Sequence, residues 1–245
     1  MKRLLIVKNC AREGPGLFEK ILSDHSVAFE IIDLDRGERL PTFNDFRALL
    51  VLGGPDSAND ATPKIKGLLQ QIHEALGAGI PYLGVCLGLQ LLVKAAGGTV
   101  VKNRIREIGF RDPDGDFYRV DLTAEGQSDP LLAGMETSFP VFQLHGETVV
   151  LTGEDRLLGT GATCVNQVVR AGRRAYGIQG HLELTGPLLT RWMAEDPDLS
   201  HLSAADLQKD FTLLRDQIER SGEILFGNFL SLVGLSSPEN RISPN

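Results

Sequence analysis

The chain of 245 residues carries 25 Lys and Arg against 32 Asp and Glu, and its formal net charge is -7 at pH 7. Hydrophobic residues make up 42% and charged residues 23%, the balance of an ordinary globular protein. This length allows one large domain, with or without a small appendage. The acidic balance argues against a protein that coats nucleic acid through clustered basic residues, so we expect no nucleic-acid partner.

Neither a secretory leader nor a membrane span is predicted from the apolar runs. Lys8 ends the first run, over 4–7, too early for a signal peptide, and no run approaches the ~20 residues of a membrane helix. Cys10, Cys86 and Cys164 stand far apart and form no C-x-x-C pair, which argues against a disulfide framework and a metal site. We expect a cytoplasmic protein without a metal.

Short apolar runs alternate with helical patterns over the first hundred residues. The predicted strands cover 4–7, 28–34, 48–52 and 80–85, and the predicted helices cover 16–22, 63–76 and 87–96. Pro63 suits the first turn of its helix, where the missing N–H costs nothing. Strands that alternate with helices predict an α/β fold, with an open, mostly parallel sheet that has helices on both faces.

The pattern changes from about residue 99. Short β-like runs lie at 117–122, 138–144, 148–151, 163–169 and 175–178, and we expect antiparallel strands that extend or flank the main sheet. After Gly186 the pattern is helical, and Ser203 and Asp206 have the spacing of a capping box. We expect one domain over 1–190, a helical extension packed on it over 191–235, and a flexible tail over 236–245.

The most informative segment is 84–90, which reads GVCLGLQ between a predicted strand and a predicted helix. This is the context of a nucleophile elbow, in which a sharp turn projects one side chain above the sheet. Gly84 and Gly88 leave room for that turn, and the helix N-terminus favours a Cys86 thiolate. The N–H of Leu87 is free to donate to an oxyanion. The alternative is that Cys86 is a small buried core residue.

His181 is the best candidate for the base that a thiolate needs. It follows a short apolar strand, and the His-x-Glu spacing puts Glu183 on the same side of an extended segment. Glu183 would then fix the orientation of the ring while its other nitrogen faces Cys86. The other candidates His25, His73 and His201 lie in polar or helical segments and are predicted surface residues.

Two glycines, Gly53 and Gly54, end the predicted strand over 48–52 and begin the sequence GGPDS. Ligands bind at this end of the strands in open parallel sheets, and glycines let backbone N–H groups approach a ligand closely. Gly54 is therefore a candidate second oxyanion donor. A tight turn without ligand contact is the alternative.

Together, GGP after the third strand, GVCLGLQ and the late G-H-x-E resemble the class I (triad) glutamine amidotransferase family, over about residues 2–183. FQLHGE at 142–147 and EIG at 107–109 resemble the branch that contains the amidotransferase portion of GMP synthase. The resemblance implies the flavodoxin-like fold of that family and a thiol attack by Cys86 on the side-chain amide of glutamine. It also implies that Gln90, His145 and Gly146 lie at the substrate, the last two through their backbone, and that no cofactor is needed.

Two departures from the family pattern are visible. Leu182 stands where the family usually has proline, which frees a backbone angle beside Glu183. No glycine-rich phosphate loop follows a strand, and the last ~60 residues are too few for an acceptor-activating domain of typical size. Ammonia would then pass to an acceptor on another chain, such as a separate synthetase subunit.

Other functions stay open on the sequence alone. A γ-glutamyl peptidase of the same fold would use the same triad on glutathione-like compounds and release an amine. A non-catalytic regulatory partner would keep the elbow only for structural reasons. The group of Cys-elbow hydrolases and chaperones with a similar sheet usually has histidine directly after the nucleophile, where this chain has Leu87.

Overall fold

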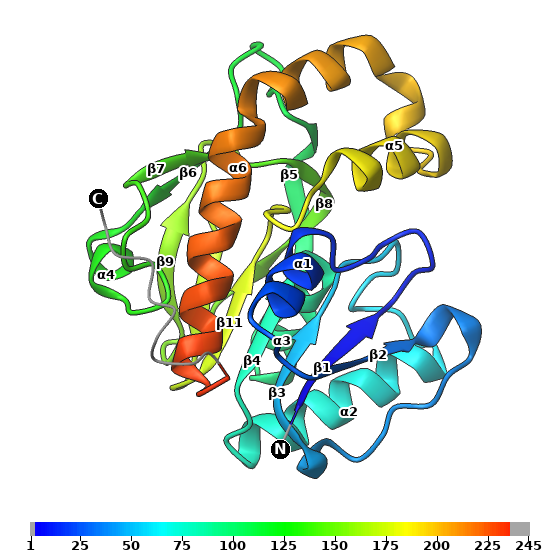
Figure 1. Cartoon of the computed structure of the whole chain (residues 1–245), viewed down its shortest axis with the longest axis vertical. Coiled ribbons are helices and arrows are strands. Elements are labelled where there is room, and N and C mark those ends of the chain that lie inside the picture. The colour runs from blue at the N-terminus through cyan, green and yellow to red at the C-terminus, as the bar shows by residue number, and fades with distance from the viewer. Residues whose placement is uncertain (1–2, 236–245) are drawn as a thin grey trace.

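The structure is a computed structural model that describes residues 3–235, except for the side chain of Asn44. The expected tail over 236–245 lies outside the described residues. A mixed nine-stranded sheet runs through the molecule in the order β2-β1-β3-β4-β11-β10-β9-β6-β7 (Figure 1). Its parallel part consists of β2 (Phe29–Asp33), β1 (Arg3–Lys8), β3 (Phe46–Val51), β4 (Tyr82–Val85) and β11 (Ala175–Ile178).

The remaining strands are antiparallel, as the sequence predicts for part of this region. β10 (Val168–Ala171), β9 (Arg156–Thr160), β6 (Arg119–Leu122) and β7 (Ser138–Pro140) extend the sheet beyond β11. A separate two-stranded ribbon is formed by β5 (Thr99–Gly109) and β8 (Gln143–Val150). The α/β fold with a mostly parallel central sheet and added antiparallel strands is confirmed.

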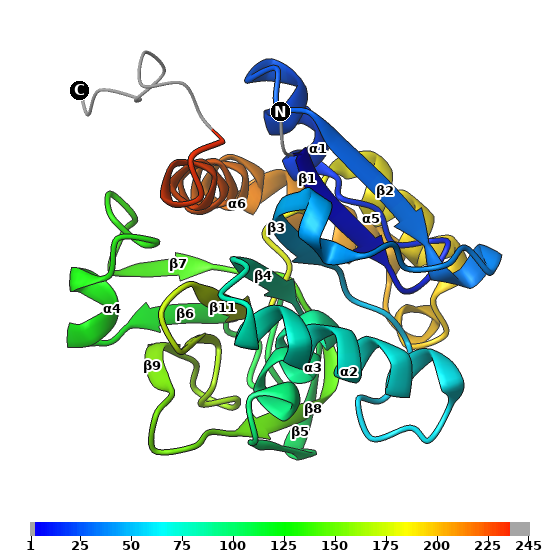
Figure 2. The same ribbon diagram turned by 90° about the horizontal axis from the view of Figure 1, so that it is seen from below.

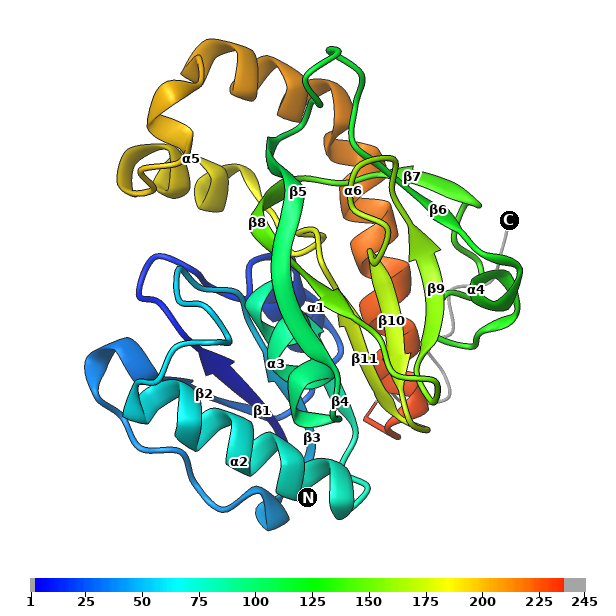
Figure 3. The ribbon, with the colours of Figure 1, turned by 180° about the vertical axis from the view of Figure 1, so that it is seen from behind.

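Helices cover both faces of the sheet (Figure 2). One face carries α1 (Leu17–Asp24) and the long α6 (Ala204–Leu232), whose Phe18 and Phe226 rings stack at 4.4 Å. The other face carries α2 (Pro63–Gly77) and α3 (Leu87–Ala95), and the β5–β8 ribbon lies over α3 (Figure 3). Two apolar cores result, one on each side of the sheet, because a parallel sheet must bury both faces.

The remaining helical segments connect these layers. They are α4 (Ala124–Ser128), α5 (Gly186–Glu195) and three short 3-10 turns at Leu34–Arg36, Phe43–Asp45 and Leu199–His201. Helix α2 begins with Pro63 in its first turn, as predicted, and Thr62 caps it by accepting from the N–H of Ile65. Among residues 3–235, no helix is both long and apolar enough to cross a bilayer.

The β-rich middle of the chain differs from the prediction in several places. β11 is antiparallel to β10 but parallel to β4, so it belongs to the central sheet rather than to a flanking antiparallel group. β5 and α4 were not predicted because most of their residues are polar and exposed, and β9 was not predicted because its apolar part, Leu157 and Leu158, is too short to show a pattern. The run predicted over 138–144 is divided into β7 and the start of β8, which pair with different strands.

Candidate active site

The candidate residues meet at the carboxyl ends of four neighbouring strands, β1, β3, β4 and β11. The segments that follow these strands contain Glu13, Gly53, Cys86 and His181 respectively. They are distant in sequence but adjacent in the sheet, because parallel strands end at the same edge. The sheet order therefore assembles the site that the sequence predicts at this edge.

Cys86 lies in the turn between β4 and α3 with a backbone φ of 51°, an unusual value for a non-glycine residue. Its N–H donates to the carbonyl of Ile178 at 2.8 Å, which ties the turn to β11. A Cβ on Gly84 would overlap the backbone of Gly88, and a Cβ on Gly88 would overlap the carbonyl of Val51. Only glycine fits at these two positions, so the strained elbow predicted from the sequence is present.

His181 faces Cys86 and is held by Glu183. Its Nδ1 donates to Oε1 of Glu183 at 2.7 Å, and both side chains are buried. Burial lowers the pKa of His181, but the charge of Glu183 and hydrogen bonds to Cys86 and Glu183 outweigh it and raise the pKa well above its usual value. The three side chains are thus buried next to one another, with Glu183 hydrogen-bonded to His181, although Leu182 replaces the proline of the family pattern.

Aromatic packing and a backbone bridge fix the His181 ring. The N–H of His181 donates to the carbonyl of Phe142 at 2.9 Å. The rings of His181 and of Trp192 in α5 pack in a T-shaped arrangement, at a centroid distance of 4.9 Å and an interplanar angle of 74°. These two contacts restrict both the backbone and the ring of His181.

The two candidate oxyanion donors lie beside each other. Leu87 is the first residue of α3, so its N–H has no partner one turn earlier in the helix. A Cβ on Gly54 would lie 3.2 Å from Cδ2 of Leu87 and 2.8 Å from Cβ of Asn9. The β3 loop at Gly54 therefore lies next to the N-terminus of α3.

The predicted substrate residues on α3 and β8 lie on the side of Cys86 that faces the β5–β8 ribbon. Sγ of Cys86 is 3.8 Å from the carbonyl oxygen of Leu144. Nε2 of Gln90 donates to the carbonyl of Glu147 at 3.2 Å, which links α3 to β8. A Cβ on Gly146 would meet the side chain of Arg106 at 3.2 Å. The backbone of β8 therefore lines one side of the cysteine.

The His145 side chain points into a hydrogen-bonded cluster. Its Nε2 contacts Oε2 of Glu107 at 2.7 Å, and its Nδ1 contacts the carbonyl of Glu147 at 3.0 Å. Gln167 and Thr163 also donate to Glu107. Both ring nitrogens thus have protein partners, and the side chain is not directed at the Cys86 sulfur.

Cys164 lies beside Glu107 and His145. Among residues 3–235, these three side chains are the group whose types can bind a metal, and their ligand atoms lie within 4.8 Å of one another. Burial raises the pKa of the Cys164 thiol to about 11, so the sulfur carries its proton at neutral pH. His145 is hydrogen-bonded to Glu107, and the hydroxyl of Thr148 lies 3.2 Å from the Cys164 sulfur. These side chains therefore link β5, β8 and the segment before β10.

Glu13 lies at the site but was not predicted from the sequence. It follows β1 in the segment EGPG, is 6% exposed, and burial raises its pKa to about 7. Its place after a parallel strand was the available signal, since ligand sites form at that edge. His73 and His201 are exposed and lie outside the site, as predicted, and His25 is half-buried.

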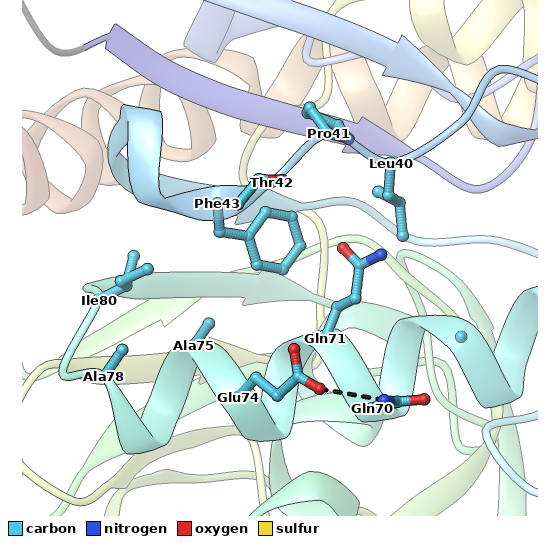
Figure 4. A pocket seen from close by; sticks show the side chains of 11 residues that line it. Leu40, Pro41, Thr42, Phe43, Gln70, Gln71, Glu74, Ala75, Ala78 and Ile80 are labelled. Atoms are coloured by element: carbon cyan, nitrogen blue, oxygen red, sulfur yellow. Dashed lines mark hydrogen bonds between the residues drawn. The ribbon is translucent and has the colours of Figure 1, made fainter.

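A surface hollow lies apart from the site, between α2 and the loop over 40–43 (Figure 4). Its volume is about 330 Å3, and Gln70 donates to Glu74 at 3.0 Å in its lining. None of the candidate site residues lines this hollow. The chemistry indicated by Cys86 is therefore not connected with it.

Comparisons with known proteins agree with this geometry. Residues 20–193 match the family model of the class I glutamine amidotransferases. A glutamine amidotransferase-like protein of Salmonella typhimurium is 30% identical over 179 residues, which are 71% of this chain and 72% of that protein. A crystal structure of a glutamine amidotransferase from Methylobacillus flagellatus has a TM-score of 0.83 and 25% identity, and the match covers 100% of this chain and 99% of that one.

Two further relatives differ from each other in activity. A GMP synthase of Edwardsiella ictaluri is 28% identical over 77% of this chain, and the match covers 35% of that protein. A γ-glutamyl-L-1-hydroxyisopropylamide hydrolase of a Pseudomonas species is 31% identical over 58% of this chain and 48% of that protein. The matched family model spans more than half of the chain and includes Cys86 and His181. The chain belongs to the class I glutamine amidotransferase family.

Proposed function

We propose that this protein hydrolyses the side-chain amide of glutamine through a thioester on Cys86 and releases ammonia. The observation that carries the proposal is the series Cys86–His181–Glu183 at the edge of the sheet, with the cysteine in a strained elbow at a helix N-terminus. Such an elbow has a structural cost that a merely packed cysteine would not need. A nucleophile, a base and a group that orients the base are the parts required for acyl transfer.

In the first step, the Cys86 thiolate attacks the amide carbon and a C–S bond forms. The carbonyl oxygen becomes an oxyanion, for which the N–H groups of Leu87 and Gly54 are the proposed donors. As the C–N bond breaks, protonated His181 gives its proton to the nitrogen, which leaves as ammonia. The raised pKa of His181 supports this role, because the ring must still hold a proton at neutral pH.

In the second step, water attacks the thioester carbon while neutral His181 takes one of its protons. The C–S bond then breaks, which regenerates the Cys86 thiolate and releases glutamate. Glu183, which is hydrogen-bonded to Nδ1, stabilises the imidazolium that gives up its proton in the first step and forms again in the second. No further reactant is needed, since water supplies the oxygen of the new carboxylate.

Binding of the glutamyl part is assigned to residues around the cysteine. We propose that Gly53, Gln90, His145 and Gly146 line this subsite, with His145 and Gly146 contributing backbone groups. The support is the closeness of the Leu144 carbonyl to Sγ and the Gln90 bridge to β8. The Glu107–His145 pair would hold this backbone rigid.

The fate of the ammonia is part of the proposal. We propose transfer to an acceptor bound by another chain, such as a separate synthetase subunit, in the cytoplasm. The match to GMP synthase supports this idea, because the aligned part covers only 35% of that longer protein.

A γ-glutamyl hydrolase is the second candidate, favoured by the match to a protein named for hydrolysis of a γ-glutamyl amide. The same cysteine, histidine and carbonyl chemistry applies, and the leaving group is an amine instead of ammonia. The two candidates differ only in the room needed beyond the scissile bond.

The experiment compares free glutamine with γ-glutamylethylamide and glutathione, and follows glutamate release from each. Faster turnover of glutamine supports the first candidate, and faster turnover of the substituted amides supports the second. Cys86→Ala is the control and should abolish release, while an electrophilic glutamine analogue should add its mass to Cys86 in the wild type only. If all three compounds are inert and no adduct forms, the proposal is wrong, and a non-catalytic regulatory role is favoured.

A further inference from the structure

A second carboxyl group, that of Glu13, lies near the His181 imidazole, in the loop after β1. A Cβ placed on Gly53 would overlap Oε2 of Glu13, and the same point lies 3.3 Å from Cε1 of His181 and 3.4 Å from Cβ of Cys86. The Glu13 carboxyl, the ring carbon between the two histidine nitrogens, and the cysteine thus surround one position. Gly53 keeps that position empty because it has no side chain.

The loop that carries Glu13 is fastened at several points. Arg12 forms an ion pair with Asp196 at 2.6 Å, and Trp192 donates through Nε1 to the carbonyl of Arg12 at 3.3 Å. The N–H of Leu17 donates to the carbonyl of Glu183 at 2.9 Å. The loop is therefore bound to the same helix and the same segment that hold His181, so the position of Glu13 is fixed relative to the ring.

Glu13 is buried without a structural partner that would explain it. The residue is 6% exposed, and its Oε2 has no hydrogen-bond partner among the residues that the structure describes. A buried, unpaired carboxyl group is costly, so a protein has reason to keep one only where the group has a use. The nearest group with a proposed chemical role is His181.

We propose that Glu13 is a positioning residue for His181, whose carboxylate stabilises the imidazolium from the ring edge that Glu183 leaves open. The inference rests on the proposed function, since it assigns a purpose to the proton on His181. Glu183 holds Nδ1 and Cys86 faces the other nitrogen, so the Cε1 edge is the remaining polar edge of the ring. Positive charge on an imidazolium is spread over this edge as well.

The charged groups around Glu13 set the pH at which it acts. Burial raises the pKa of Glu13 to about 7, while His181 and Arg12 lower it, and Glu183 and Asp196 raise it. Cys86 also lies close, with its Cβ 3.4 Å from the point at which a Cβ on Gly53 would stand. Below pH 7 Glu13 is neutral; above pH 7 its ionisation helps His181 to keep its proton while the solution becomes more alkaline. By reciprocity, a protonated His181 favours the ionised form of Glu13.

The direct test follows the His181 ring by NMR in protein labelled with 13C at histidine Cε1. The chain has five histidines, and the His181 signal is assigned by its loss in His181→Gln. In the wild type, we expect this signal to show an additional inflection near pH 7 that reports Glu13. If the His181 signal titrates without any inflection near pH 7, the proposal is overturned, and this measurement requires no Glu13 variant.

Glu13→Gln keeps the shape of the side chain and removes its charge. We expect the inflection near pH 7 to disappear and the affinity of His181 for its proton to fall about tenfold, which is one pKa unit. Glu19→Gln is the matched control, because Glu19 is an exposed glutamate on the adjacent helix α1, and it should change neither feature. An unchanged His181 titration in Glu13→Gln contradicts the proposal.

Two further readouts separate this role from a structural one. Ionisation of Glu13 at a raised pKa opposes folding as pH rises from about 4.5 to about 7, so Glu13→Gln should unfold in urea at the same or a higher midpoint than the wild type at pH 8. A lower midpoint would indicate a structural role and overturn the inference. When Glu13→Gln is assayed with an active substrate above pH 7, its kcat should be lower than that of the wild type and its KM should be unchanged. A rise in KM alone would make Glu13 a substrate contact.

These readouts also separate the two proposals. If none of the glutamyl compounds is hydrolysed, the proposed function fails, but the NMR titration still shows whether Glu13 sets the proton affinity of His181. If the compounds are hydrolysed and the NMR titration lacks the inflection, only the role of Glu13 is refuted.

Discussion

The structure contains two buried histidine–glutamate pairs with hydrogen bonds of equal length, made through Nδ1 in His181 and through Nε2 in His145. His181 lies 2.7 Å from Glu183, and His145 lies 2.7 Å from Glu107. The difference is what the second ring nitrogen meets. In His181 it faces the Cys86 sulfur, whereas in His145 it meets the carbonyl of Glu147 at 3.0 Å. The same pair of residue types therefore lies beside a cysteine in one place and links β5 to β8 in the other.

The surroundings of the pairs explain this division. Glu107 accepts further hydrogen bonds from Thr163 and Gln167, so its carboxylate is shared among several donors. Oε2 of Glu183 has no hydrogen-bond partner among residues 3–235, so its charge acts mainly on His181. A carboxylate with fewer competing donors holds an imidazolium more strongly, which suits a histidine that must be protonated for catalysis.

The largest expected difference between the pairs is in turnover. His181→Gln should lower kcat by about 10⁴-fold, because both steps pass a proton through this ring. His145→Gln should lower it by less than about tenfold, since that side chain supports the backbone and does not face the sulfur. Steady-state glutamate release from the better substrate measures both. A larger loss in His145→Gln than in His181→Gln would reverse the assignment.

The next largest difference is in stability. Glu107→Gln removes the charge from a network with three donors, and we expect a loss of about 3 kcal/mol in the free energy of unfolding. Glu183→Gln should cost less, because Glu183 has one hydrogen-bonded side-chain partner and an unpaired oxygen. Urea unfolding at pH 7 compares the two variants. Equal losses would show that the two pairs contribute alike to the fold.

The smallest expected effect is a displaced pH profile. The charge of Glu183 raises the pKa of His181, so the wild type should keep its acid-dependent turnover well above the usual range of histidine. Glu183→Gln removes this charge, and the alkaline limb of kcat/KM should move to lower pH by roughly one unit or more. Glu107→Gln should leave the limb in place. The profile is measured from pH 5 to 10 at low substrate concentration.

Local sequence patterns were sufficient for the parts of the site that lie on single turns. The spacing of Gly84, Cys86 and Gly88 required a tight strand-to-helix turn, and the structure shows the close backbone approaches that exclude larger residues. The alternation of His181 and Glu183 likewise predicted a same-side pair, which is hydrogen-bonded. Both features depend on neighbours within a few residues, so they can be read from the chain directly.

The placement of β11 depended on interactions between distant segments. It forms a short hairpin with β10, as an antiparallel strand would, but its other edge pairs in parallel with β4. Its hydrophobic pattern is compatible with both neighbours, so the sequence pattern could not identify the second one. This pairing brings His181 beside Cys86.

The sequence by itself determined the alternation of strands and helices, the elbow at Cys86 and the pairing of His181 with Glu183, because each is specified by local backbone geometry. Only the tertiary structure decided that β1, β3, β4 and β11 end side by side, and that Glu13 and Trp192 therefore lie against the His181 ring. It also decided that His145 is directed at Glu107 rather than at the sulfur. The reason is physical: which side chains become neighbours at a sheet edge depends on strand order and burial, which are properties of the whole fold.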